Sequence, residues 1–136
     1  MSREYVENNE VEQIAEELIP HMEWRDTPEI KFLMLVADKS IYAGKCSKAT
    51  GKWKYLTDKD FIIEVWDGFW KTADTKAKEA LVYHELKHID FLEDEETGEI
   101  VWKLRRHDVE EFHDVVEKYG YWNEALKEFF ARSMDT

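Results

Sequence analysis

The sequence predicts an α+β domain in which a small mixed β-sheet packs on one long helix, with further helices at both ends. Short apolar runs with strand character at residues 30–37 and 60–66 predict the sheet. A longer segment, roughly residues 74–92, has helical periodicity and contains the pattern His-Glu-x-x-His at 84–88. Because 136 residues are enough for one core with little room for accessory elements, we expect a single domain over 1–136.

The first half of the chain alternates predicted helix and strands. Residues 9–19 predict an amphipathic helix that Pro20 ends, with four apolar side chains facing inward: Val11, Ile14, Ala15 and Leu18. Residues 41–48 and 52–56 lie on either side of a predicted turn at Thr50-Gly51 and are expected to be strands or hairpin arms.

The second half predicts helices joined by a hairpin. Turn-forming residues at 95–99 and an apolar run at 100–104 indicate a short hairpin after the metal-binding helix. Two further helices are expected at about 108–119 and 123–133.

The pattern His84-Glu85-x-x-His88 carries the chemistry. Two histidines four residues apart project from one face of a helix and can bind one metal ion, which places Glu85 beside the metal's open position, where it can act on a bound water. At helical period the three residues fall within apolar stripes formed by Ala77, Leu81, Phe91, Val82, Ile89 and Leu92. Burying these polar groups is costly unless a cation compensates them, and imidazole ligands favour Zn²⁺.

A third ligand is needed because catalytic zinc usually has three protein ligands and one exchangeable water. His107 is the predicted third ligand, since it directly precedes a helix start with Asp108 as N-cap and Glu111 as its capping-box partner. Asp108 and Glu111 remain alternatives, because a carboxylate oxygen also binds zinc. His21 and His113 are expected to face solvent.

Segments from about residue 30 to 122 resemble a family of small phage metallopeptidases that are regarded as zincins. The resemblance is carried by the strand at 60–66, His84-Glu-Leu-Lys-His88, the hairpin, His107-Asp-Val-Glu-Glu-Phe112 and Tyr119-Gly-Tyr-Trp122. The chain is more distantly similar to SprT-like zincins, in which the helix Phe usually follows the third histidine by four residues. Here Phe112 is five residues after His107 and four after Asp108, which keeps Asp108 open.

The resemblance implies a minimal zincin-like fold and zinc-dependent hydrolysis of a protein or peptide substrate. It places residues 61–66 as the edge strand that would hold an extended substrate by backbone pairing. Glu85 would take a proton from the zinc-bound water and pass it to the leaving amine. Tyr119 and Tyr121, which follow the third-ligand helix, are candidate donors to the oxyanion.

Composition limits the partners and the cellular compartment expected for the protein. The net charge of −12 argues against a nucleic-acid binder, although lysines interleaved with aromatic residues between 45 and 59 form a local basic segment. A single cysteine, Cys46, fits a reducing compartment. With no apolar stretch long enough for a membrane span or signal peptide, the sequence predicts a cytoplasmic protein, in the host if phage-encoded.

Two other function classes stay open at the level of sequence. The metal could be structural in a non-catalytic module that binds a host or phage factor, which would tolerate Glu85→Gln. The site could also hydrolyse another amide or ester, because the same zinc, water and carboxylate serve both reactions. The intact Glu85 favours catalysis, since a purely structural zinc has no need of an acid there.

Overall fold

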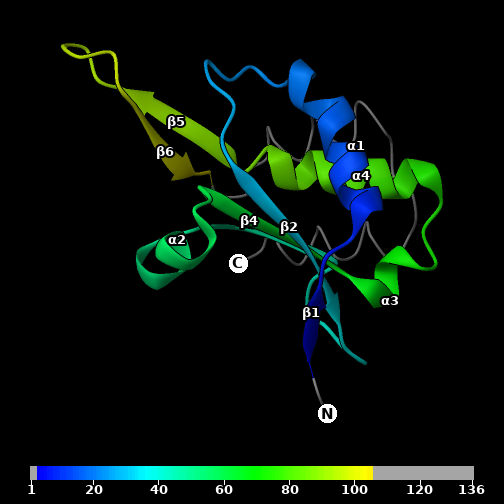
Figure 1. The fold of residues 1–136 in the computed structure, drawn as a ribbon. Helices are drawn as coiled ribbons and strands as arrows, with labels where there is room; N and C mark the ends of the chain where they lie inside the picture. The colour runs from blue at the N-terminus through cyan, green and yellow to red at the C-terminus, as the bar shows by residue number, and fades with distance from the viewer. Residues whose placement is uncertain (1–2, 106–136) are drawn as a thin grey trace.

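The computed structural model describes residues 3–105, which form two β-sheets and the helices around them (Figure 1). In chain order the elements are β1 (Glu4–Val6), α1 (Asn9–Leu18), the 3₁₀ turn η1 (Ile19–His21), β2 (Ile30–Val36), β3 (Gly44–Lys48), α2 (Gly51–Thr57), β4 (Phe61–Trp66), α3 (Asp67–Trp70), α4 (Thr75–Leu86), β5 (Ile89–Glu93) and β6 (Ile100–Leu104). The fold is α+β, as the sequence predicts. The predicted helices at 108–119 and 123–133 lie outside the described residues.

The larger sheet has four strands in the order β1-β2-β4-β3. The apolar strands β2 and β4 run parallel at its centre, and β1 and β3 join them antiparallel, one on each side. The expectation that residues 61–66 form an edge strand is therefore wrong. The nearly continuous apolar run of β4 suits a central position, whereas β3, with two lysines among its five residues, takes the edge.

One face of this sheet carries α1 and α4, which cross each other above β2 and β4 (Figure 1). The core lies between them. Its fully buried side chains include Val11 and Ala15 from α1, Phe61, Ile63 and Val65 from β4, and Leu81, Val82 and Leu86 from α4. Three of the four residues predicted to line the inner face of the first helix, Val11, Ala15 and Leu18, are buried, and Ile14 is half-buried.

The helix α4 begins where the sequence predicts and ends earlier. Asp74 is its N-cap, and the Asp74 side chain accepts a hydrogen bond of 2.8 Å from the backbone N–H of Ala77. The helix stops at Leu86, so the expected helix over 74–92 is wrong in its last turn and a half.

The reason for this early end is the β5–β6 hairpin. Residues 89–93 pair antiparallel with residues 100–104, from Ile89 opposite Leu104 to Glu93 opposite Ile100. Phe91 therefore belongs to a strand, where it meets Trp102 edge to face with ring centroids 6.1 Å apart. The predicted turn is confirmed, with Gly98 at a φ of +74°.

The connection between β3 and β4 also differs from expectation. Residues 52–56, predicted to be a strand or hairpin arm, belong to the helix α2, and the strand expected over 41–48 is confirmed only for Gly44–Lys48. Gly51, expected to form a turn with Thr50, is instead the first residue of α2, with Thr50 as the N-cap and a φ of +53° at Gly51. Among the described residues, no helix combines the length and the apolarity that crossing a membrane would require.

Candidate metal centre

The end of α4 and the turn that follows it bring His84, Glu85 and His88 together. Their exposed fractions are 1%, 3% and 6%, so the three polar side chains are buried in the apolar interior. The two imidazole rings have centroids 5.0 Å apart and are nearly perpendicular, at 86°. Two imidazoles that share a tetrahedral zinc, with Zn–N bonds of about 2.0–2.1 Å, have centroids separated by roughly 5 Å. The spacing of these rings is therefore that of a pair of ligands to one ion.

His88 keeps this position although the regular helix ends two residues before it. The backbone N–H of Lys87 donates to the carbonyl of Tyr83 at 3.0 Å, and that of His88 donates to the carbonyl of Glu85 at 3.1 Å. These two hydrogen bonds continue the helical turn beyond Leu86, through Lys87 to His88. His88 stays on the same side of the chain as His84, and the next residue can enter β5.

The orientation of the His88 ring is set by a backbone group. Its Nδ1 lies 2.6 Å from the carbonyl oxygen of Arg105, at the end of β6. Because a carbonyl oxygen can only accept, Nδ1 carries the proton, and in the neutral imidazole Nε2 is then the basic nitrogen. Histidines that bind metals commonly donate their other N–H in this way. Sequence offers no signal for this contact, since any residue supplies a backbone carbonyl.

The Glu85 carboxylate lies between His88 and the edge of the sheet. Its Oε1 is 4.0 Å from Nε2 of His88. On the other side is Gly44 of β3: a Cβ atom added there would lie 3.1 Å from Oε2 of Glu85 and 3.0 Å from Cδ1 of Leu81. A glycine inside a strand can mark such a close approach. That signal was present in the sequence, but the approach of β3 to Glu85 was not predicted.

This contact makes Gly44→Ala a sensitive probe of the site. The added methyl group must displace Glu85 or Leu81 by a few tenths of an ångström, so we expect any reaction in which Glu85 takes part to slow about tenfold or more, because such a reaction depends on the placement of the reacting groups. Metal content should match that of wild type, since neither histidine is touched. Kinetics of Gly44→Ala alongside Ser47→Ala, a change on the opposite face of the same strand, would measure this. Equal turnover in Gly44→Ala and wild type would contradict the close packing of β3 on Glu85.

The residues present fit a divalent cation. A carboxylate and two imidazoles, all nearly excluded from solvent, are costly to bury unless a positive charge compensates them. Nitrogen donors of this kind suit zinc. Within residues 3–105 there is no group of three or more His, Cys, Asp or Glu side chains that could hold a metal ion. The predicted third ligand His107 and its alternatives Asp108 and Glu111 lie outside the described residues, as do Tyr119 and Tyr121.

Another buried carboxylate, Glu64, lies in β4 but does not belong to this centre. Its neighbours Ile63 and Val65 face α4, so the alternation of the strand turns Glu64 to the opposite face of the sheet. There Tyr42 donates a 2.8 Å hydrogen bond to Oε1 of Glu64. Burial, together with this bond and the nearby negative charge of Glu64, raises the pKa of Tyr42 to about 12.

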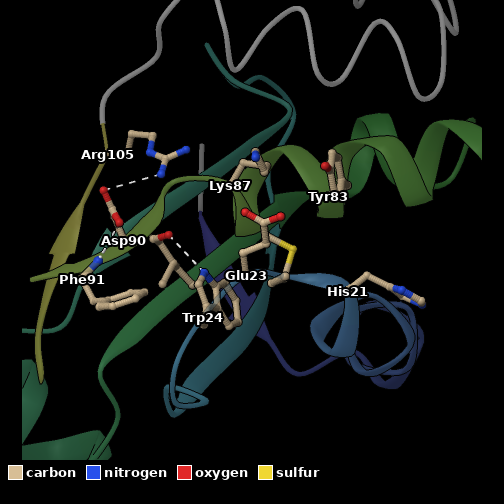
Figure 2. Close-up of a pocket in the computed structure, with 10 residues that line it drawn as sticks. His21, Glu23, Trp24, Tyr83, Lys87, Asp90, Phe91 and Arg105 are labelled. Atoms are coloured by element: carbon tan, nitrogen blue, oxygen red, sulfur yellow. Dashed lines mark hydrogen bonds and ion pairs between the residues drawn. The ribbon is translucent and has the colours of Figure 1, made fainter. Parts of the chain in front are cut away.

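A pocket of about 560 Å³ lies beside the end of α4 (Figure 2). Tyr83 and Lys87 line it, and none of the three motif residues does. On its floor the indole N–H of Trp24 donates to the carbonyl of Ile89 at 3.3 Å. Arg105 pairs with Asp90 across the hairpin at 3.6 Å. The pocket is lined by residues 21–24, by the end of α4 and by the β5–β6 hairpin, and His21 is exposed there, as predicted.

An α+β domain that packs a His-Glu-x-x-His helix against a small mixed sheet has the architecture of a small zincin-like domain. A family model described as "Putative phage metallopeptidase" matches residues 3–130. The chain belongs to this family, as the resemblance of its motifs suggests. Comparisons of this chain with the curated proteins and with the solved structures found no match.

Proposed function

We propose that this protein is a zinc-dependent peptidase in which Glu85 is the general base. The position of the Glu85 carboxylate carries this proposal. It is buried, lies 4.0 Å from Nε2 of His88, and faces the backbone of an edge strand at Gly44. A general base needs this combination of a fixed position, a neighbouring metal ligand and a surface on which a substrate can lie.

His84 and His88 would hold the metal through imidazole nitrogens, with His107 as the proposed third ligand. When bound, the metal would lower the pKa of a water molecule to about 7 and polarise the carbonyl of the substrate. Glu85 accepts a proton from the attacking water and later returns it to the leaving amine. The hydrogen bond from Nδ1 of His88 to the Arg105 carbonyl holds the ring in place throughout.

The position of the strand β3 favours a polypeptide as the substrate. Among the described residues it pairs with β4 on one side only, and it lies against α4. A strand edge offers backbone N–H and C=O groups, and an extended peptide can add to it as a further strand. A peptide on β3 would pass directly beside Glu85. We place this activity in the cytoplasm, where the Cys46 thiol stays reduced.

A non-catalytic module that binds a host or phage factor is the alternative, and hydrolysis of other amides or esters is a second one. The buried Glu85 favours catalysis over a purely structural metal, and the sheet edge beside it favours a polypeptide over a small amide.

Comparing cleavage in cells tests the proposal. Bacterial cells expressing wild type or Glu85→Gln at equal levels would be compared by mass spectrometry of new protein N-termini. We expect one or a few N-termini that occur with wild type alone. Identical sets of N-termini, obtained from metal-loaded protein, would favour the non-catalytic module.

A further inference from the structure

The segment that follows β3 combines positive charge with exposed apolar side chains. Residues 45–59 contain five lysines and one aspartate in a chain whose net charge is −12. Within it, α2 carries Trp53, Tyr55 and Leu56 with exposed fractions of 54%, 87% and 68%. Every residue of α2 is exposed except the half-buried Thr57. Figure 1 shows α2 projecting from the end of β3 and β4, on the side where the β5–β6 hairpin also projects.

The lysines of this segment differ in their partners. Lys54 pairs with Asp60 at 3.1 Å and Lys59 with Glu29 at 3.4 Å. Among the described residues, Lys48 and Lys52 are exposed and have no carboxylate within ion-pair distance; the Lys52 ammonium lies 5.5 Å from the centre of the Trp53 ring. These two positive charges thus form no ion pair within the described part of the fold.

Folding explains the charge of Lys54, through its ion pair with Asp60, but explains neither the charge of Lys52 nor the exposed apolar side chains of α2. A seven-residue helix is too short to be stable by itself and usually relies on burying one face, which α2 does not do. Lys52 stands in its first turn, where the helix dipole disfavours a cation. The exposed aromatic side chains and the lysines without an ion pair therefore contribute little to the stability of the fold. Side chains of this kind, gathered at one place on the surface, indicate a binding surface.

The position of Lys48 relates this surface to the candidate centre. Gly44, Cys46 and Lys48 share one face of β3, because side chains alternate along a strand, and Gly44 is the residue beside Glu85. Lys48 is four positions along the strand from Gly44, a distance of about 13 Å at roughly 3.3 Å per residue. At the Lys48 end, Trp102 of β6 packs on Phe61, the β4 partner of Lys48. The hairpin thus also borders the path from Glu85 to α2.

We propose that the surface formed by Lys48, Lys52, Trp53, Tyr55 and Leu56, here called the α2 surface, binds an acidic segment of the polypeptide substrate that also carries apolar side chains. The proposal rests on the proposed function, because it takes β3 as the substrate strand. A peptide paired with β3 beside Glu85 reaches the α2 surface about four residues away along its chain. The lysines would contact its carboxylates, and the exposed rings its apolar residues.

A polypeptide fits this surface better than a nucleic acid. The backbone groups of the β3 edge pair with a peptide backbone and not with a phosphodiester chain. A long polyanion would also meet the negative charge of the rest of the molecule, whereas a short acidic segment needs only the local lysines.

Binding of matched peptides tests the α2 surface separately from catalysis. Two fluorescent twelve-residue peptides share the same Leu and Phe positions, and one carries Glu where the other carries Gln. Binding is measured by anisotropy with metal-loaded Glu85→Gln protein, and cleavage is measured with wild type. We expect the acidic peptide to bind about tenfold more tightly, less so at high salt, and to be cleaved more efficiently.

Lys48→Glu/Lys52→Glu should remove this preference for the acidic peptide in both measurements. The matched control is Lys39→Glu/Lys76→Glu, which changes the net charge equally at two exposed lysines that belong to neither β3 nor α2 and should retain the preference. Trp53→Ala should weaken the binding of both peptides to the same degree, because it removes an apolar contact and no charge.

Four outcomes are distinguishable. Equal binding and cleavage of the two peptides, unchanged by Lys48→Glu/Lys52→Glu, would overturn this inference and leave the proposed function standing. Lysine-dependent binding of the acidic peptide without any cleavage by wild type would support the α2 surface and overturn the proposed function. Tighter binding of single-stranded DNA of the same length at the same lysines would overturn the inference in favour of nucleic acid. Lysine-dependent dimerisation that blocks peptide binding would overturn it in favour of a second copy of this chain.

Discussion

Glu85→Gln is expected to lower kcat/KM by about 10²–10⁴-fold, the contribution typical of a general base, while the fold and the metal content stay as in wild type. The amide has the shape of the carboxylate, so the packing against Gly44 and Leu81 is retained. It cannot accept a proton from water at neutral pH. Steady-state kinetics on a peptide cleaved by wild type, together with elemental analysis of the same preparations, would measure both effects.

Glu64→Gln is the matched control for this variant. Glu64 is also a buried carboxylate, yet it lies on the opposite face of the sheet and accepts a hydrogen bond from Tyr42, which an amide oxygen can accept as well. The activity of Glu64→Gln should stay near that of wild type. Undiminished hydrolysis in Glu85→Gln would refute the role of Glu85 as base, and loss of metal there would show that Glu85 acts mainly by holding the site together.

His84→Ala is expected to abolish metal binding and hydrolysis together and to remove the stabilisation that the metal provides. A ligand present at 1,000 times its Kd stabilises the folded state by about 4 kcal/mol. Wild type should therefore lose several degrees of Tm in the presence of a chelator, whereas His84→Ala should start from a lower Tm and not respond to chelator. Elemental analysis and thermal unfolding with and without chelator would measure this.

The same measurements on His107→Ala, Asp108→Ala and Glu111→Ala identify the third ligand. We expect one zinc per chain in wild type, Asp108→Ala and Glu111→Ala, and little in His107→Ala. Retention in His107→Ala with loss in one of the carboxylate variants would move the third ligand to that residue. Absence of tightly bound metal from freshly purified wild type would contradict the metallopeptidase proposal and favour the non-catalytic module.

The elements that the sequence predicted well are those with strong local signals. The first helix has an apolar face at helical period, and Pro20 marks its end. The strands β2 and β4 are runs of apolar residues with strand character, which loops seldom contain. Asp74 caps α4 by a local hydrogen bond within three residues. Such features depend on neighbours along the chain, so the sequence is enough to predict them.

The errors have a different cause. Phe91 and Leu92 continue the apolar period of α4, but pairing with residues 100–104 stabilises a strand there, and cross-strand pairing cannot be read from a helical period. The helix α2 was missed because its lysines and aromatic residues suit an exposed hairpin arm equally well. The edge strand was misassigned to residues 61–66 because strand order depends on contacts between distant segments.

By itself the sequence indicated the α+β class and the family, and the spacing of His84, Glu85 and His88 predicted that these three residues lie together. Only the tertiary structure decided that β3 is the strand beside Glu85, that the Arg105 carbonyl orients His88, and that Lys48 and α2 lie on the path leading away from the centre. These relations join residues separated by up to 41 positions in the chain (Gly44 to Glu85). They arise from the packing of the sheet on α4, and packing is a property of the whole fold.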